Sequence, residues 1–159
     1  MLSVQLVGDR ELVAKLQAMP ARVHDALLKK VMTLALQLEA KVKQKLSGEV
    51  LNVRSGALRR SIFETIQDDP TTVVGKVASS GDVKYAGIHE FGGTIPAHEI
   101  VPNKAMALAF VIGGKQVFAT RVEIPDVQMP QRSYLRSSLT EMEPQIVEGL
   151  REAVREGMQ

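Results

Sequence analysis

The chain has 159 residues, of which 45% are hydrophobic, and this suits a single domain with one core. It has no cysteine, which excludes disulfides and thiolate metal sites. It also lacks both an apolar run long enough to cross a membrane and the start of a signal peptide, so we expect a soluble protein.

The net charge of +2 is unevenly distributed along the chain. Residues 1–60 hold 11 Lys/Arg and 5 Asp/Glu (+6), whereas residues 61–159 hold 9 and 13 (−4). Two interpretations stay open. Oppositely charged helices lie side by side within one molecule, or they meet between copies in an assembly.

The first third of the chain predicts a strand and two helices. Alternating apolar residues at 2–6 indicate a short strand at a sheet edge. Asp9 is a good N-cap for a short helix that Pro20 interrupts. Residues 21–46 follow the helical period without Gly or Pro, so they predict a long amphipathic helix. The polar side of that helix is basic and carries Lys29, Lys30, Lys41, Lys43 and Lys45.

A hairpin is predicted after a polar connection at 47–56, which we expect to be a mobile loop. Residues 62–67 alternate as a strand does, Asp68-Asp69-Pro70 forms a turn, and residues 72–78 return. The strands of the sheet are therefore expected to be mostly antiparallel.

A short segment, Tyr85 to Gly93, is the densest in distinctive residues. Tyr85, Ile88 and Phe91 fall on one side of a helical turn, with His89 and Glu90 facing elsewhere. Gly92 and Gly93 predict a sharp reversal, because glycine adopts positive φ without steric cost. We expect Tyr85 and Phe91 to anchor this turn against the sheet, and not to contact a ligand.

The last third predicts extended chain and a second long helix. Residues 95–101 and 105–112 look extended, and Gly113-Gly114 suits a two-residue hairpin turn. Residues 117–124 are expected to form the returning strand. Residues 94–103 are rich in turn formers, so we expect an arm or loop that orders on contact with neighbours. From Arg132 onward the helical period returns, and Pro144 either kinks this helix or starts its main segment. Its polar side carries Glu141, Glu143, Glu148, Glu152 and Glu156.

Catalytic and ligand-binding motifs are incomplete in this chain. His89-Glu90 and His98-Glu99 suggest a zinc protease, but the second histidine that the motif needs is replaced by Gly93 and Pro102. Gly113-Gly114-Lys115 lacks the other residues of a phosphate loop. The basic residues have no interleaved aromatic side chains to stack bases, so sequence-specific nucleic-acid binding is not expected. We predict no enzyme activity, no cofactor and no metal.

Three segments together carry a family resemblance: Arg54-Ser-Gly-Ala-Leu-Arg-Arg-Ser-Ile62, Tyr85-Ala-Gly-Ile-His-Glu-Phe-Gly-Gly93 and Pro130-Gln-Arg-Ser-Tyr-Leu135. In this order they resemble the tail-completion and virion-morphogenesis proteins in the neck of long-tailed bacteriophages. The resemblance implies a small mixed sheet flanked by helices, a ring at the head–tail junction and no catalysis. A common form of the last motif has a second proline where this chain has Ser133. The family's characteristic positions would be Tyr85, His89, Glu90, Phe91, Gly92 and Arg132.

The sequence thus predicts an α+β domain over 1–159, in which a small, mostly antiparallel sheet packs against two long helices. The resemblance implies a homo-oligomeric ring, with a hexamer as one candidate, located in the virion after assembly in the host cytoplasm beside other neck and tail proteins. The alternatives are a non-phage oligomeric adaptor and a small hydrolase. In a ring, outward basic and acidic helix faces would meet across a subunit boundary. The expected interface residues, besides the motif positions and Gly93, are Lys41, Lys43, Lys45, Glu148, Glu152 and Glu156.

Overall fold

The computed structural model describes residues 9–83, 85–103 and 105–159, and the chain forms two compact units. Unit 1 comprises the residues up to Ala86 together with residues 133–159, and unit 2 comprises residues 87–132. The fold is α+β, as predicted, with helices and antiparallel strands. The sequence predicts one domain and gives no sign of the second unit. The strand predicted at 2–6 lies outside the described residues.

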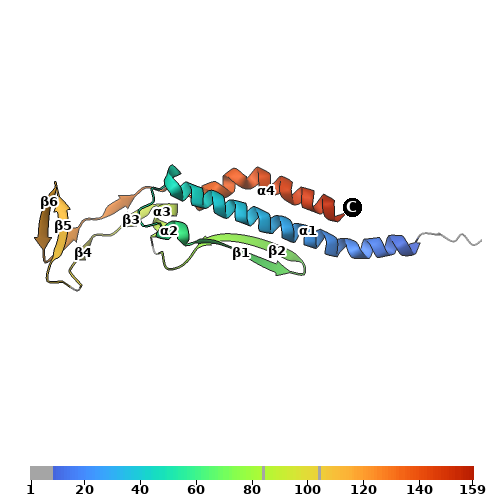
Figure 1. The fold of residues 1–159 in the computed structure, drawn as a ribbon, viewed down its shortest axis with the longest axis horizontal. Coiled ribbons are helices and arrows are strands. Elements are labelled where there is room, and N and C mark those ends of the chain that lie inside the picture. The colour runs from blue at the N-terminus through green and yellow to red at the C-terminus, as the bar shows by residue number, and fades with distance from the viewer. Residues whose placement is uncertain (1–8, 84, 104) are drawn as a thin grey trace, which may run out of the picture. The chain divides into compact units, whose positions relative to one another are not determined.

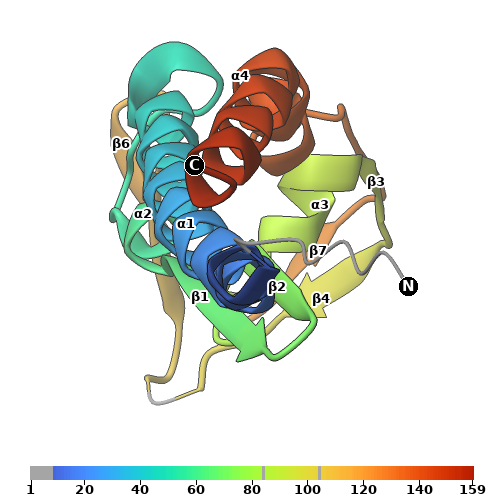
Figure 2. The ribbon, with the colours of Figure 1, turned by 90° about the vertical axis from the view of Figure 1, so that its right-hand side faces the viewer.

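Unit 1 contains two long helices and one hairpin (Figure 1). Helix α1 (Asp9–Gln44) is followed by a short π-helical turn, η1 (Lys45–Glu49), and by α2 (Ala57–Arg60). Strands β1 (Ile62–Asp69) and β2 (Thr72–Ser79) form the predicted hairpin, and α4 (Leu135–Gly157) closes the unit. Figure 2 shows α1 between the β1–β2 hairpin and α4.

Two prolines lie inside these helices. The sequence predicted that Pro20 interrupts a short helix, but Pro20 lies within the continuous α1. Pro144 likewise lies within α4. Proline lacks one backbone donor and crowds the preceding turn, yet helix-forming residues on both sides can sustain the helix through it.

The core of unit 1 lies where α1 ends and α4 begins. Val42 and Leu46 pack there with Leu51, and Ile62 and Tyr134 are each 1% exposed. Residues 47–49 of the predicted loop belong to η1 and residues 50–56 are irregular, but Leu51 is buried in this core. The connection is therefore anchored at its centre by an apolar side chain.

Unit 2 contains most of α3 (Ala86–Phe91) and a long two-stranded arm, residues 93–129. The arm's strands pair concentrically: β3 (Gly93–Ile95) with β8 (Val127–Met129), β4 (His98–Ile100) with β7 (Val122–Ile124), and β5 (Leu108–Ile112) with β6 (Lys115–Ala119). The loop expected at 94–103 therefore contains two paired strands. Gly113 and Gly114 form the predicted turn, with φ of 55° and 79°.

Two interruptions divide the arm into three ladders. Pro96 and Pro125 lie between the first and second ladders, where a proline cannot donate a ladder hydrogen bond. Between the second and third, seven residues of sequence (101–107) separate β4 from β5 but only two (120–121) separate β6 from β7, a difference of five (7 − 2). The pairing register changes there by the same five residues.

Candidate functional site

Tyr134 is the point in unit 1 at which the three sequence motifs converge. Its ring lies in the core with Leu58 and Ile62 of the first motif, and Ala86 of the second packs against that core. The Tyr134 hydroxyl donates a hydrogen bond to the Ala86 carbonyl oxygen at 3.2 Å. The buried Ser138 hydroxyl donates to the Tyr134 carbonyl oxygen at 2.6 Å. The motif tyrosine thus joins elements distant in sequence.

Within unit 2, the end of α3 is tied to the chain that follows β8. The Arg132 amide donates to the His89 carbonyl oxygen at 2.8 Å, and the Gln131 side-chain amide donates to the Glu90 carbonyl oxygen at 3.1 Å. Gly92 has a φ of 70°, and a Cβ there would lie 2.8 Å from the Gln131 amide nitrogen. Only glycine permits this approach. The structure therefore brings the backbone of His89, Glu90 and Gly92 close to that of Gln131 and Arg132.

His89 and Glu90 face inward. Glu90 is only 3% exposed, so its carboxylate is not presented to an outside ligand. Burial lowers the pKa of His89, and the positive charge of Arg132 lowers it further. A neutral imidazole is therefore favoured at this position near neutral pH.

Tyr85 and Phe91 do not occupy the position predicted for them. Tyr85 is 44% exposed and Phe91 is 64% exposed, so the prediction that both rings are packed as anchors of the turn against the sheet is wrong. The turn is held by backbone contacts around Gly92 and by Ile88, whose Cδ1 lies 3.2 Å from where a Cβ of Gly93 would be. The spacing placed Tyr85, Ile88 and Phe91 on one side of the helical turn, but of the three only Ile88 is half-buried.

The charged faces of α1 and α4 meet inside one chain. Lys41 Nζ lies 2.7 Å from a Glu141 carboxylate oxygen, and Lys30 Nζ lies 3.3 Å from Glu152. The buried Lys45 also pairs with Glu141 and donates to the Ser137 hydroxyl at 2.9 Å. Hydrogen bonds from Lys41 and Lys45 lower the pKa of Glu141.

The prediction of a contact between subunits assumed that the basic and acidic helix faces both point outward. The pairs within one chain contradict that assumption, and the intramolecular interpretation holds for them. Two further charges have partners within their own helices, since Lys43 pairs with Glu39, and Glu148 with Arg151 and Arg155. Charges at the edge of an apolar helix stripe can reach across to the neighbouring helix, because lysine and glutamate side chains are long.

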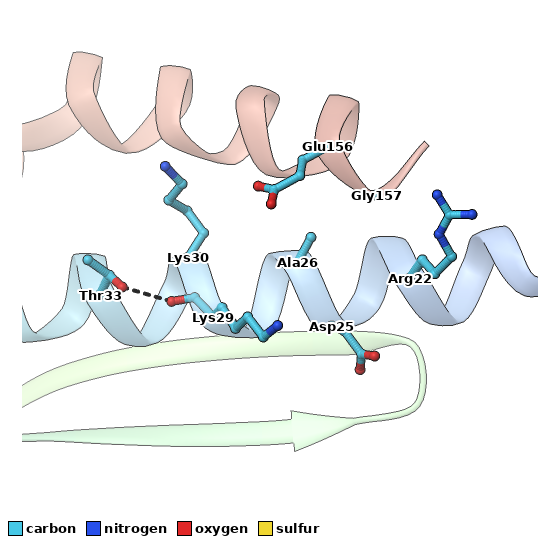
Figure 3. Close-up of a pocket in the computed structure, with 8 residues that line it drawn as sticks. All are labelled: Arg22, Asp25, Ala26, Lys29, Lys30, Thr33, Glu156 and Gly157. Atoms are coloured by element: carbon cyan, nitrogen blue, oxygen red, sulfur yellow. Dashed lines mark hydrogen bonds between the residues drawn. The ribbon is translucent and has the colours of Figure 1, made fainter. Parts of the chain in front are cut away.

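Glu156 lies at a charged hollow between α1 and the end of α4 (Figure 3). Figure 3 shows Lys30 and Glu156 extending into the space between the helices, whereas Asp25 points away from α4. At Gly157 the two helices lie in close contact, because a Cβ there would lie 2.4 Å from Val23 Cα. Charges of both signs line the hollow, which gives it no preference for one class of charged ligand.

The histidines take separate structural positions. His24 Nε2 lies 3.0 Å from the Asp69 carbonyl oxygen and 3.1 Å from an Asp68 carboxylate oxygen, while His98 Nδ1 lies 3.0 Å from the Pro96 carbonyl oxygen. Within residues 9–83, 85–103 and 105–159, no three His, Asp or Glu side chains are grouped to hold a metal ion. Nor does any helix in that part of the chain have the length and apolarity to cross a bilayer.

The tip of the arm, Leu108–Ala119, carries exposed apolar side chains that the sequence did not predict. Opposed residues of an antiparallel pair share a face, so Phe110 and Val117 lie on one face of the tip, and Ala109 and Phe118 on the other. Val111 is 68% exposed, Ile112 62% and Phe118 65%. Apolar residues at consecutive positions beside Gly113-Gly114 are the signal that could have predicted a hairpin apolar on both faces.

Comparison with known proteins adds no identification: no protein-family model, curated protein or solved structure matches the chain.

Proposed function

We propose that the protein is a structural subunit of a homo-oligomeric ring at the neck or tail end of a long-tailed bacteriophage, where it completes the tail and joins it to the head. The observation that carries the assembly is the arm tip, which has apolar side chains on both faces. A lone two-stranded hairpin is marginally stable in water, and large exposed apolar patches are typical of interaction sites. Neighbouring subunits in a ring would cover these faces.

The motif geometry supports the family assignment within this proposal. The segments that resemble the neck proteins lie apart in the sequence, and they meet around Tyr134 in unit 1 and around Gly92 in unit 2. Such convergence is expected when the motifs maintain one fold. Buried Glu90 and surface-exposed Phe91 suit a scaffold with a contact surface better than an active site.

Assembly is tested on the full chain by size-exclusion chromatography with light scattering, followed by negative-stain imaging. We expect rings for the wild type. The double variant Val111→Asp/Phe118→Asp should form assemblies of lower mass than the wild type, because it places charges on two side chains that are exposed and apolar in the subunit. Gln116→Asp is the matched control, since Gln116 lies opposite Val111 on the same face. A wild-type protein that is monomeric at all concentrations would overturn the proposal.

The phage assignment has its own test. Head and tail structural genes are expected on both sides of the gene that encodes this chain. Neighbouring genes of cellular metabolism, together with ring formation, would instead favour a non-phage oligomeric adaptor.

A further inference from the structure

An apolar groove runs along unit 1 between β2 and α4, with α1 as its floor. Ala35 and Leu38 contribute from α1, Val73 and Gly75 from β2, and Leu139 and Ile146 from α4. Leu139 is 50% exposed. Apart from Leu139 and Gly75, the side chains and backbone that line the groove are buried or half-buried, so the groove is a narrow apolar slot between three elements.

The same groove is bordered by an unpaired strand edge. In the described part of the chain, β2 pairs with β1 alone, so its other edge presents free backbone donors and acceptors. Gly75 has an exposed backbone and lies directly on α1, since a Cβ there would be 3.0 Å from Val31 Cγ1. An extended segment could therefore add to β2 while its side chains enter the groove.

The arm tip matches this groove in length and chemistry. The β2 residues along the groove lie between Val73 and Val77, a run of five, and β5 and β6 each contain five residues. Leu108 to Ala119 carry apolar side chains on both faces and one ionisable residue, Lys115, beside the turn. One face of the tip can enter the groove while the other remains available for a further contact.

The charges at the two ends fix a direction. Val73 follows the β1–β2 turn, where Asp68 and Asp69 are exposed. Lys115 is also exposed, at the turn end of the arm. With the arm lying along β2 and its turn toward Thr72, the single positive charge of the tip meets the acidic turn.

We propose that the groove between β2 and α4 receives the arm tip of a second copy of this chain. The contact is heterologous, because a groove on unit 1 of one copy meets an arm on unit 2 of the next, and repetition of such a contact closes a ring or continues as a filament. This inference rests on the proposed function and specifies how its subunits join.

Cysteine cross-linking tests the contact without interference from native thiols, because the natural chain contains no cysteine. Two single variants, Val111→Cys on the arm tip and Leu139→Cys in the groove, are mixed and oxidised. We expect a product of twice the 17.4 kDa chain mass in the mixture, in much higher yield than either variant gives when it is oxidised alone. Thr140→Cys replaces Leu139→Cys as the control. It is exposed but turned by about 100° around the helix, so it should give at least tenfold less product.

Two cross-linking results would overturn the contact while leaving the proposed function intact. One is rings by light scattering and imaging without the specific cross-link, which would place the interface elsewhere. The other is a link formed only within the Val111→Cys/Leu139→Cys double variant at monomer mass, which would mean that the arm fills its own groove. Monomers without a cross-link would overturn the proposed function and this contact together.

The charge direction is tested by Lys115→Glu. This variant should reduce the cross-link yield severalfold at low salt. Adding Asp69→Lys on the groove partner should restore it. No change in either case would contradict the orientation assigned to the arm.

Discussion

Gly149→Ala should stabilise the packing of α4 on α1. Gly149 is a buried residue in the interior of α4, and a Cβ there would lie 3.4 Å from Lys30 Cδ and 3.6 Å from Leu34 Cδ1. Both distances are close to ordinary contact, and the lysine side chain can move slightly. Alanine is better than glycine inside a helix by roughly 0.8–1 kcal/mol, because glycine loses more backbone entropy on folding.

We therefore expect Gly149→Ala to raise the free energy of unfolding by about 1 kcal/mol. For a chain of this size that corresponds to about 2–4 °C in Tm. Thermal and urea unfolding, followed by circular dichroism, measure both quantities, and the urea m-value should stay unchanged. Gly157→Ala is the matched contrast. Its Cβ would lie 2.4 Å from a backbone atom of Val23, so the end of α4 must move. A lower Tm for Gly149→Ala would refute the spacing of the two helices that underlies this prediction.

Three further variants or titrations test the motif residues. Tyr134→Phe removes the hydrogen bond to Ala86 and should cost about 1 kcal/mol in urea unfolding, whereas an unchanged midpoint would exclude that bond as a stabilising contact. Gly92→Ala should cost more than about 1 kcal/mol and speed hydrogen exchange around Gln131, because alanine disfavours the positive φ and meets that backbone; unchanged exchange would contradict this. Burial lowers the pKa of His89 below 6.5, so its contribution to stability is complete above that pH and is lost as the pH falls through 6.5 toward the folded-state pKa. An NMR titration of the imidazole should show a midpoint under 6.5, and a higher one would contradict the assignment.

Local chemistry made much of the fold predictable. Asp68-Asp69-Pro70 and Gly113-Gly114 specify their turns through residues that adopt few alternatives, and both hairpins occur where predicted. The long helices follow from apolar periodicity, which requires no knowledge of distant contacts. The motif around Gly92 was identifiable for the same reason, since consecutive glycines mark unusual backbone.

What covers each face could not be predicted from spacing alone. The pattern at Tyr85, Ile88 and Phe91 defines one side of the helical turn that α3 completes, but burial depends on elements that approach from elsewhere, and Phe91 is exposed. The ion-pair partner of Lys45 could not be predicted either, because Glu141 is 96 residues away in the sequence. Sequence periodicity orients a side chain on its own element, and tertiary packing decides which neighbour it meets.

The concentric pairing of the arm also determines how the arm can fold. Gly113-Gly114 brings Ile112 and Lys115 together across a two-residue loop, whereas Gly93 and Met129 are 36 positions apart (129 − 93). Loop-closure entropy grows with the length of chain enclosed, so closing the base first would be the more costly start. Pairing can instead spread outward from the glycine turn, each ladder shortening the loop that the next must close. In this order the glycine turn at the tip forms first, and the close approach of Gly92 to Gln131 at the base of the arm forms last.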